Sequence, residues 1–264
     1  MPSTSKYTSK LAGTAVLIVG GSSGIGFGVA EALVENGVGH IYLSSSQSSK
    51  VAAAVERLKA AYPTETAKTT TVTGLTVDLA DEVHAEDNVR NLFAQIDRKL
   101  DHIVFTAGDA LAPSSLDDVT LASARKLGQV RFFGAVLVAK YGSRVLNPGP
   151  ASSITFTTGA AAEKPTPGWS VIASYASALF GLTRGLALDL KPVRVNLVSP
   201  GAVETELWDG FGPAKPEALA QFASKTTTGK VGAVEDVVEG YLFAIKDKNV
   251  TGTIIRTDGG LFLV

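Results

Sequence analysis

Three glycines stand where an apolar run meets a helical pattern. The run TAVLIVG (14–20) has the length and composition of a buried strand, and GIGFGVAEALVENG (24–37) has the apolar spacing of a helix. Glycines between the two let the backbone approach a pyrophosphate, whose charge is stabilised by the free N–H groups and dipole of the helix N-terminus. The pattern therefore predicts a dinucleotide site. Its expected residues are Gly20, Ser22, Ser23, Gly24, Ile25 and Gly26.

The second apolar run, HIYLS (40–44), ends in hydroxyl groups rather than in an acid. A protein of this architecture that prefers NAD usually places a carboxylate here, on the 2′-hydroxyl of the ribose. This chain instead offers the hydroxyls of Ser44, Ser45 and Ser46 and the ammonium group of Lys50 to a 2′-phosphate. We therefore expect NADP(H) as the cofactor, and we expect one of the serines to cap the helix that starts near Lys50.

Composition limits the remaining possibilities. The chain has 264 residues, 45% of them hydrophobic, which is enough for one sizeable core, so we expect a single domain over 1–264 with a polar lead over 1–12. Its 24 basic and 25 acidic residues give a net charge of −1 without long runs of one sign, which argues against a nucleic-acid partner. The absence of cysteine and three scattered histidines predict no metal site. With no apolar leader and no run of membrane-spanning length, we expect a cytoplasmic protein that has no membrane partner.

Apolar runs and helical patterns alternate along the chain. The seven runs that predict strands are 14–20, 40–44, 73–78, 102–108, 152–159, 193–201 and 252–260. Helical patterns between them include a long one from about Leu116 to Leu146 and GWSVIASYASALFGLTRGLALDL (168–190). Parallel strands need helical crossovers, so the fold class is α/β, with one doubly wound Rossmann-type domain and a seven-stranded parallel sheet. Ligands of such sheets bind beyond the carboxyl ends of the strands.

Several of these segments resemble the short-chain dehydrogenase/reductase family over nearly the whole chain. Besides the glycines, the matching motifs are Asp78-Leu79, TAG (106–108), GLTRGLALDL (181–190), VRVNLVSPGAVETELW (193–208) and TGTIIRTDGG (251–260). The resemblance implies that Asp78 and Leu79 contact the adenine. It also implies a small-molecule substrate. The subunits are expected to form dimers or tetramers that associate through the two long helices. Further cofactor contacts that it implies are Ala107, Gly108, Pro200, Gly201, Val203 and Thr205.

The family's catalytic Asn, Ser, Tyr and Lys are all missing from this chain. Counting back from Gly181 places Ile172 at the Tyr position and Ala176 at the Lys position. Thr158 stands at the Ser position and Arg131 at the Asn position. Because its guanidinium stays protonated, Arg131 cannot act as an acid, but it can bind a carbonyl oxygen or the cofactor through a charge-assisted hydrogen bond.

Losing the acid restricts the chemistry. Hydride addition to a ketone leaves an alkoxide that needs a proton, whereas hydride addition to an iminium cation gives a neutral amine directly. We therefore expect an NADPH-dependent reductase of a cyclic iminium. One alternative is a carbonyl reductase that uses Tyr175, although Leu179 at the matching Lys position would leave the phenol's pKa near 10. The other is a non-redox cyclase scaffold that retains the cofactor.

Within the family, the chain is similar to the fungal bifunctional reductase and Diels-Alderase enzymes of the paraherquamide and malbrancheamide group of prenylated indole alkaloid pathways. The similarity rests on Arg131, on the absent Tyr and Lys, and on the loop EKPTPGWS (163–170). It implies an intramolecular [4+2] cycloaddition after the reduction, with Trp169 packing on the substrate. Thr166 stands where that group has an aspartate, so it can hydrogen-bond the substrate, while a negative charge has to come from Asp109 or Glu163.

Overall fold

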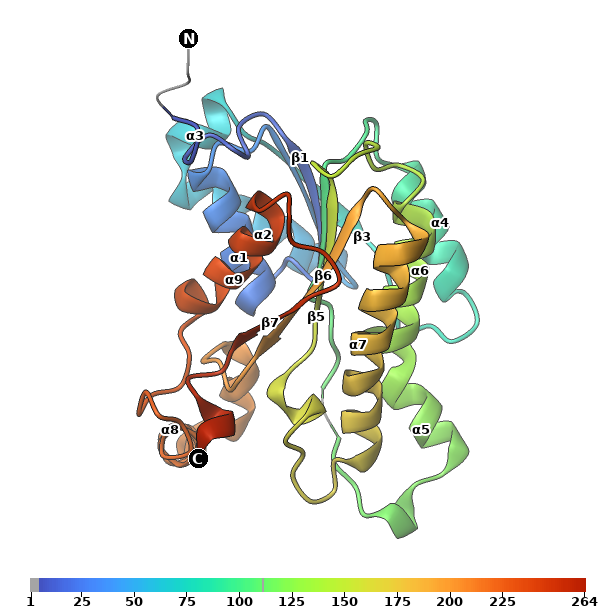
Figure 1. The fold of residues 1–264 in the computed structure, drawn as a ribbon, viewed down its shortest axis with the longest axis vertical. Coiled ribbons are helices and arrows are strands. Elements are labelled where there is room, and N and C mark those ends of the chain that lie inside the picture. Colours follow the sequence, from blue (N-terminus) through green and yellow to red (C-terminus); the bar gives the residue numbers. More distant parts are fainter. Residues whose placement is uncertain (1–4, 111) are drawn as a thin grey trace.

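The computed structural model describes residues 5–110 and 112–264, and its centre is a single parallel sheet (Figure 1). The seven strands lie in the order β3-β2-β1-β4-β5-β6-β7, so the predicted seven-stranded α/β fold is confirmed. Five of the predicted apolar runs contain a whole strand, whereas β2 extends one residue past the run 40–44 and β3 begins two residues before the run 73–78. Their bounds are β1 Ala15–Val19, β2 His40–Ser45, β3 Thr71–Thr76, β4 His102–Phe105, β5 Ser153–Thr157, β6 Arg194–Pro200 and β7 Ile254–Thr257.

Helices cover both faces of the sheet. One layer contains α1, α2 and α9, and the other contains α4, α6 and α7 (Figure 1). Because side chains alternate along a strand, β1 supplies both cores: Leu17 and Val19 pack in one, and Val16 and Ile18 in the other. The helix bounds are α1 Gly24–Glu35, α2 Ser48–Ala61, α3 Pro63–Lys68, α4 Ala85–Ala94, α5 Leu121–Gly128, α6 Gly134–Gly142, α7 Ser170–Asp189, α8 Lys215–Ala223 and α9 Val234–Lys246.

The order of connections changes at the centre of the sheet. The chain runs outward from β1 through β2 to β3 and then returns to β4, which pairs with the other edge of β1. The loops after β1 and β4 therefore leave toward opposite faces and form a crevice between them. This is the position at which the predicted glycine turn and the TAG segment meet.

Four details differ from the sequence-based expectation. The long helical pattern is divided into α5, a π-helical segment η2 (Gln129–Phe133) and α6. The helices α8 and α9, which no predicted pattern named, fill the chain between β6 and β7. The polar lead ends in Leu11, which is 2% exposed and packs in the core with α1.

The fourth difference concerns α7. Its 20 residues, with a mean hydropathy of 1.4 over the best window, are long and apolar enough by composition to cross a membrane, which the expectation about apolar runs had excluded. The helix instead packs beside β6 and α5, with Leu179 and Thr183 buried. We therefore treat α7 as one of the helices that cover the sheet.

Candidate cofactor and active site

The glycine turn after β1 is closed by the TAG segment after β4. Gly20 has a φ of 96°, and a Cβ atom on it would lie 2.5 Å from the backbone nitrogen of Ala107. A Cβ atom on Gly26 would lie 2.2 Å from the carbonyl oxygen of Gly20 and 2.4 Å from the hydroxyl oxygen of Thr106. Thr106 donates its hydroxyl to that same carbonyl, at 3.1 Å. No side chain larger than hydrogen fits at either glycine, so the backbone is left accessible at the start of α1.

The start of α1 holds an anion supplied by the protein itself. The backbone N–H of Gly24 donates to Oε2 of Glu206, 2.8 Å away, and Oε1 of Glu206 lies 3.5 Å from a guanidinium nitrogen of Arg57. A carboxylate is thus bound where the pattern predicts a phosphate, which is what the free N–H groups of a helix N-terminus favour. The residues present therefore fit the phosphates of a dinucleotide.

The serines after β2 differ in their surroundings. Ser44 is 1% exposed, and its hydroxyl donates to the carbonyl of Ile18, so the expectation that it reaches the cofactor is wrong. Ser45 accepts a hydrogen bond from Ser22 at 3.0 Å, which brings the two predicted segments together. Ser46 and Lys50 are exposed.

Helix α2 begins earlier than expected. Its first residue is Ser48, its N-cap is Gln47, and no side chain caps it. The expectation that a serine caps this helix is therefore wrong. Ser45 and Ser46 are not engaged in capping, so capping does not keep them from binding a ligand.

The predicted adenine contacts follow β3, and the predicted nicotinamide contacts lie at the end of β6. Asp78 is exposed and accepts from the backbone N–H of Ala80, while Leu79 is buried. At the end of β6, a Cβ atom on Gly201 would lie 3.1 Å from Cα of Asp258. Val203 is buried, and the methyl group of Thr205 lies against Gly24. Pro200 is the last residue of β6.

Arg131 lies in the π-helical segment, an insertion that is typical of functional positions in helices. Its guanidinium packs against Gly108, donates to the backbone carbonyl of Asp109 and lies 3.3 Å from the carboxylate of Asp109. Burial lowers the pKa of Arg131, and the neighbouring Asp109 carboxylate partly offsets that effect. The arrangement fixes a cation and an anion together at the end of β4.

Thr158 and α7 are joined at the positions of the missing catalytic residues. The hydroxyl of Thr158 donates to the carbonyl of Ala176 at 2.9 Å, so its proton is already engaged and only its lone pairs remain for a substrate. Ile172, one turn before Ala176, is buried. Neither position of α7 that faces this strand end supplies an acid.

Tyr175 lies on another side of α7. A Cβ atom on Gly128 would lie 2.4 Å from Cζ of its ring, and the ring is 5.7 Å from that of Phe132 and 6.0 Å from that of Phe133. The aromatic ring thus fills the contact between α7 and the helices α5 and η2. This packing favours the structural interpretation of Tyr175 over that of a proton donor.

The loop 163–170 is attached on both sides. Glu163 forms a two-pronged ion pair with Arg256, at 3.0 and 2.6 Å, and Lys164 donates to the carbonyls of Leu261 and Val264. On the other side, Gly168 accepts from the backbone N–H of Ser114. The loop therefore bridges the C-terminal segment and the segment after β4.

Two of the predicted substrate contacts lie on this loop. Thr166 is exposed, and its carbonyl accepts from the backbone N–H of Trp169 at 3.1 Å. Trp169 is half-buried at the N-cap of α7. Both carboxylates expected to supply charge have a cationic partner: Glu163 pairs with Arg256, and Asp109 pairs with Arg131 at the longer distance of 3.3 Å.

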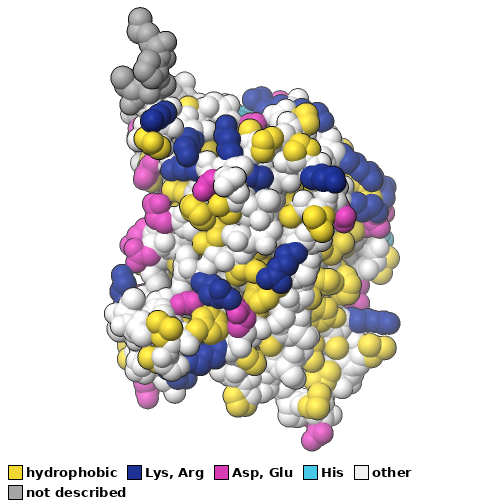
Figure 2. Space-filling view, in the orientation of Figure 1, with side chains coloured by type: hydrophobic (Ala, Val, Ile, Leu, Met, Phe, Trp, Pro, Cys, Tyr) yellow, Lys and Arg dark blue, Asp and Glu magenta, His cyan; other side chains and the backbone are white. Residues whose placement is uncertain are grey.

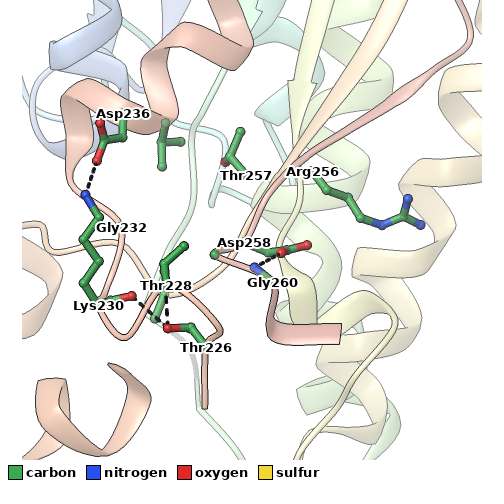
Figure 3. Close-up of a pocket in the computed structure, with 12 residues that line it drawn as sticks. Thr226, Thr228, Lys230, Gly232, Asp236, Arg256, Thr257, Asp258 and Gly260 are labelled. Carbon is green, nitrogen blue, oxygen red and sulfur yellow. Dashed lines mark hydrogen bonds and ion pairs between the residues drawn. The ribbon is translucent and has the colours of Figure 1, made fainter. Parts of the chain in front are cut away.

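A separate cavity of about 360 Å³ lies past the end of β7, next to the first turn of α9 (Figure 3). Among its charged groups, Lys230 lies 3.0 Å from the carboxylate of Asp236, Arg256 pairs with Glu163, and Asp258 accepts from the backbone N–H of Gly260. No predicted site residue lines this cavity. The threonines Thr226, Thr228 and Thr257 supply its hydroxyl groups.

Sequence reasoning missed three residues at the cofactor turn. Thr106 holds the glycine backbone, and Glu206 and Arg57 supply the anion and cation near α1. Thr106 belongs to the TAG segment and could have been identified from its position after a strand. Glu206 lies within the motif VRVNLVSPGAVETELW (193–208) and Arg57 lies in no motif, but both are far from the turn in sequence, so only the folded chain brings them there.

Comparisons with known proteins agree with this geometry. A family model described as an SDR-like Rossmann domain matches residues 7–264. The short-chain dehydrogenase/reductase fsr5 of Gibberella fujikuroi is 44% identical over 270 residues, and malC of Malbranchea aurantiaca is 41% identical over 266 residues, with all of each chain covered in both cases.

Solved structures show the same similarity. The structure of the MalC reductase/Diels-Alderase from Malbranchea aurantiaca has a TM-score of 0.92 and 40% identity, over 97% of this chain and 99% of that chain. A small-chain dehydrogenase in complex with NADPH has a TM-score of 0.75 and 31% identity, over 95% of this chain and 99% of that chain.

Proposed function

Because the chain belongs to the short-chain dehydrogenase/reductase family, we propose that it is an oxidoreductase that uses NADPH to reduce a cyclic, iminium-type intermediate of fungal prenylated indole alkaloid biosynthesis. The relatives support the oxidoreductase class and the alkaloid setting, and the NADPH complex of a structural neighbour supports the cofactor. The glycine turn and the Glu206 carboxylate bound at Gly24 support the placement of the NADPH phosphates at the start of α1.

The observation that carries the choice of substrate is the absence of an acid from the face of α7 next to Thr158. Ile172 and Ala176 have no proton to give, and the proton of Thr158 is donated to the helix backbone. Tyr175, whose ring packs against Gly128, is turned toward α5. Reduction of a C=N⁺ bond needs no proton at the reacting centre, so this site suits a cation better than a ketone.

Each remaining residue has a role in this proposal. NADPH supplies the hydride when it is bound. Asp109 provides the negative charge that stabilises the substrate cation, and Arg131 orients the Asp109 carboxylate as well as the cofactor. Thr158 accepts a hydrogen bond, and Thr166 and Trp169 contact the substrate from the loop.

A cycloaddition in the same pocket is the second part of the proposal. The loop 163–170 is fixed by Glu163 and Lys164 on one side and by Gly168 on the other, which would hold a flat substrate in one folded conformation. Restricting a reactant in this way lowers the entropic barrier to an intramolecular reaction. Clean stereochemistry of the product with NADP⁺ and without NADPH consumption would instead favour the non-redox scaffold.

Rapid-mixing absorbance at the NADPH band tests the proposed chemistry. The probes are N-methyl-3,4-dihydroisoquinolinium and 1-tetralone, which have the same ring system and differ in C=N⁺ against C=O. We expect faster NADPH oxidation with the iminium, after subtraction of the rate without protein. Faster reduction of the ketone would overturn the proposal.

We also propose a soluble, cytoplasmic homodimer or homotetramer that associates through α7 and its neighbours. Figure 2 shows mostly hydrophobic and uncharged side chains over the part of this face where α7 lies, with a Lys or Arg side chain among them, and α7 itself carries the exposed Arg184. Leu188 is 72% exposed there, and nothing lies within 4 Å of a Cβ atom placed on Gly181 or Gly185. A contiguous surface of this kind is typical of a subunit interface. Light scattering coupled to gel filtration, with Leu188→Glu as the variant, measures the assembly.

A further inference from the structure

Glu206 extends from the segment after β6 into the cofactor turn. Its carboxylate joins two elements: Oε2 accepts from the backbone N–H of Gly24 at the start of α1, and Oε1 lies 3.5 Å from Arg57 on α2. The Glu206 side chain thus accepts a hydrogen bond from the N–H group that would face a phosphate. This N–H group is a donor expected to bind an anion, but the anion bound to it belongs to the chain itself.

Arg57 is held in place independently of Glu206. Its guanidinium carbon lies 3.4 Å from the centre of the Phe27 ring, and Phe27 is 4% exposed in α1. A cation over an aromatic face is stabilised by the ring's charge distribution. The positive charge beside the turn is therefore present whether Glu206 or another anion is bound.

A phosphate and the Glu206 carboxylate cannot both use this place. The Gly24 N–H can donate to only one oxygen at good geometry, and two anions at contact distance repel each other. Both side chains of the ion pair are about half exposed, at 49% and 50%, so the carboxylate can leave into water at low cost.

The segment that carries Glu206 has a second anchor. Trp208 is 8% exposed, donates its indole N–H to the carbonyl of Val203 at 2.6 Å, and its ring lies 5.2 Å from that of Phe222. When Glu206 leaves Gly24, the segment η4 (Glu206–Ala214) stays attached at Trp208 and can change its position around that residue.

We propose that Glu206 is an internal competitor of the cofactor phosphates, and that its displacement by the cofactor releases η4 and α8 for substrate binding. This inference rests on the proposed use of NADP(H). It assigns a regulatory role to the contact between Glu206 and Gly24. Without cofactor this contact keeps η4 against α1, and on binding a cofactor phosphate replaces Glu206 at the Gly24 N–H.

Calorimetric titration of NADP⁺ into the full-length protein is the first test. The variants are Glu206→Gln and, as the matched control, Glu204→Gln, which removes the same charge two residues away and leaves Lys215 paired with Asp209. We expect Glu206→Gln to bind NADP⁺ roughly two- to tenfold more tightly than the wild type, since one charge-assisted contact no longer competes. Glu204→Gln should change the affinity clearly less.

Amide hydrogen exchange over residues 206–223 is the second measurement. Without cofactor, the segment should exchange faster in Glu206→Gln than in the wild type, and saturating NADP⁺ should raise wild-type exchange to that level. Equal affinities of the two variants, or unchanged exchange, would overturn the inference. Failure of the wild type to bind NADP⁺ would overturn the proposed function instead.

Discussion

The guanidinium of Arg131 packs against Gly108, so closely that a Cβ atom on Gly108 would lie 2.6 Å from Cζ of Arg131. The last residue of the TAG segment thus provides the surface on which the arginine rests. Arg131 in turn pairs with Asp109, the next residue after that glycine. Gly108 and Asp109 after β4, together with Arg131 in η2, therefore fix the positions of one positive and one negative charge at the end of β4.

Gly108→Ala should displace the Arg131 guanidinium while leaving the fold intact, because a long side chain that is 35% exposed can move. We expect kcat/KM for the iminium probe to fall roughly ten- to hundredfold, as is usual when an orienting group is moved by about an ångström. The measurement is steady-state NADPH oxidation, together with thermal unfolding to confirm the fold.

A double-mutant cycle shows whether the glycine acts through the arginine. In an Arg131→Gln background, Gly108→Ala should have little further effect, since the group that it displaces is gone. Additive losses would mean that Gly108 acts directly on the cofactor or substrate.

Tyr175→Phe should leave iminium reduction within about twofold of the wild type, because the ring and its packing are retained. Tyr175→Ala should instead lower the free energy of unfolding by about 2–3 kcal/mol through the lost ring contacts. Turnover of both probes and denaturant unfolding of both variants provide the check. Loss of activity in Tyr175→Phe with a normal fold would restore the tyrosine as proton donor.

The stability of the protein should fall as the pH is lowered from 6.5 to 5. Burial lowers the pKa of His102 to about 3, and burial also lowers the pKa of His40. In the unfolded chain a histidine has a pKa near 6.5. Between about pH 3 and pH 6.5, His102 is therefore protonated in the unfolded state and neutral in the folded state. Protonation therefore favours unfolding, by up to about 1.4 kcal/mol per pH unit for each such histidine.

His102→Asn provides the comparison for this effect, since an amide can keep the hydrogen bond with Ser153. Its free energy of unfolding, measured by urea titration at several pH values, should fall less steeply than that of the wild type between pH 6.5 and 5, by up to about 1.4 kcal/mol per unit. An identical slope would show that His102 takes up a proton in the folded state.

Arg256→Gln should loosen the loop 163–170, because it removes the two-pronged ion pair with Glu163. An exposed pair contributes about 1 kcal/mol or less, so amide exchange in the loop should rise by up to about fivefold. Arg90→Gln removes an ion pair of equal length, 2.6 Å to Asp87, on α4 and is the control. Equal exchange in the loop of both variants would exclude the Glu163 contact as an anchor.

The sequence by itself determined the class of fold and the position of the cofactor turn, because both depend on local patterns. Short apolar runs such as 14–20, bounded by turn residues and followed by helical patterns, predict buried strands, and the spacing of Gly20, Gly24 and Gly26 depends on the backbone alone. The register from Gly181 located the empty catalytic positions for the same reason, since a helix keeps its spacing.

Only the tertiary structure decided which groups meet. Ser44 and Ser45 are neighbours in sequence, but the alternation of a strand buries the first and turns the second toward Ser22. Glu206 reaches Gly24 across 182 residues, and no local pattern records a contact that depends on the path of the chain between them. Ion pairs and side-chain directions depend on how the elements pack. Local sequence patterns do not reveal this packing, because it depends on the complete fold.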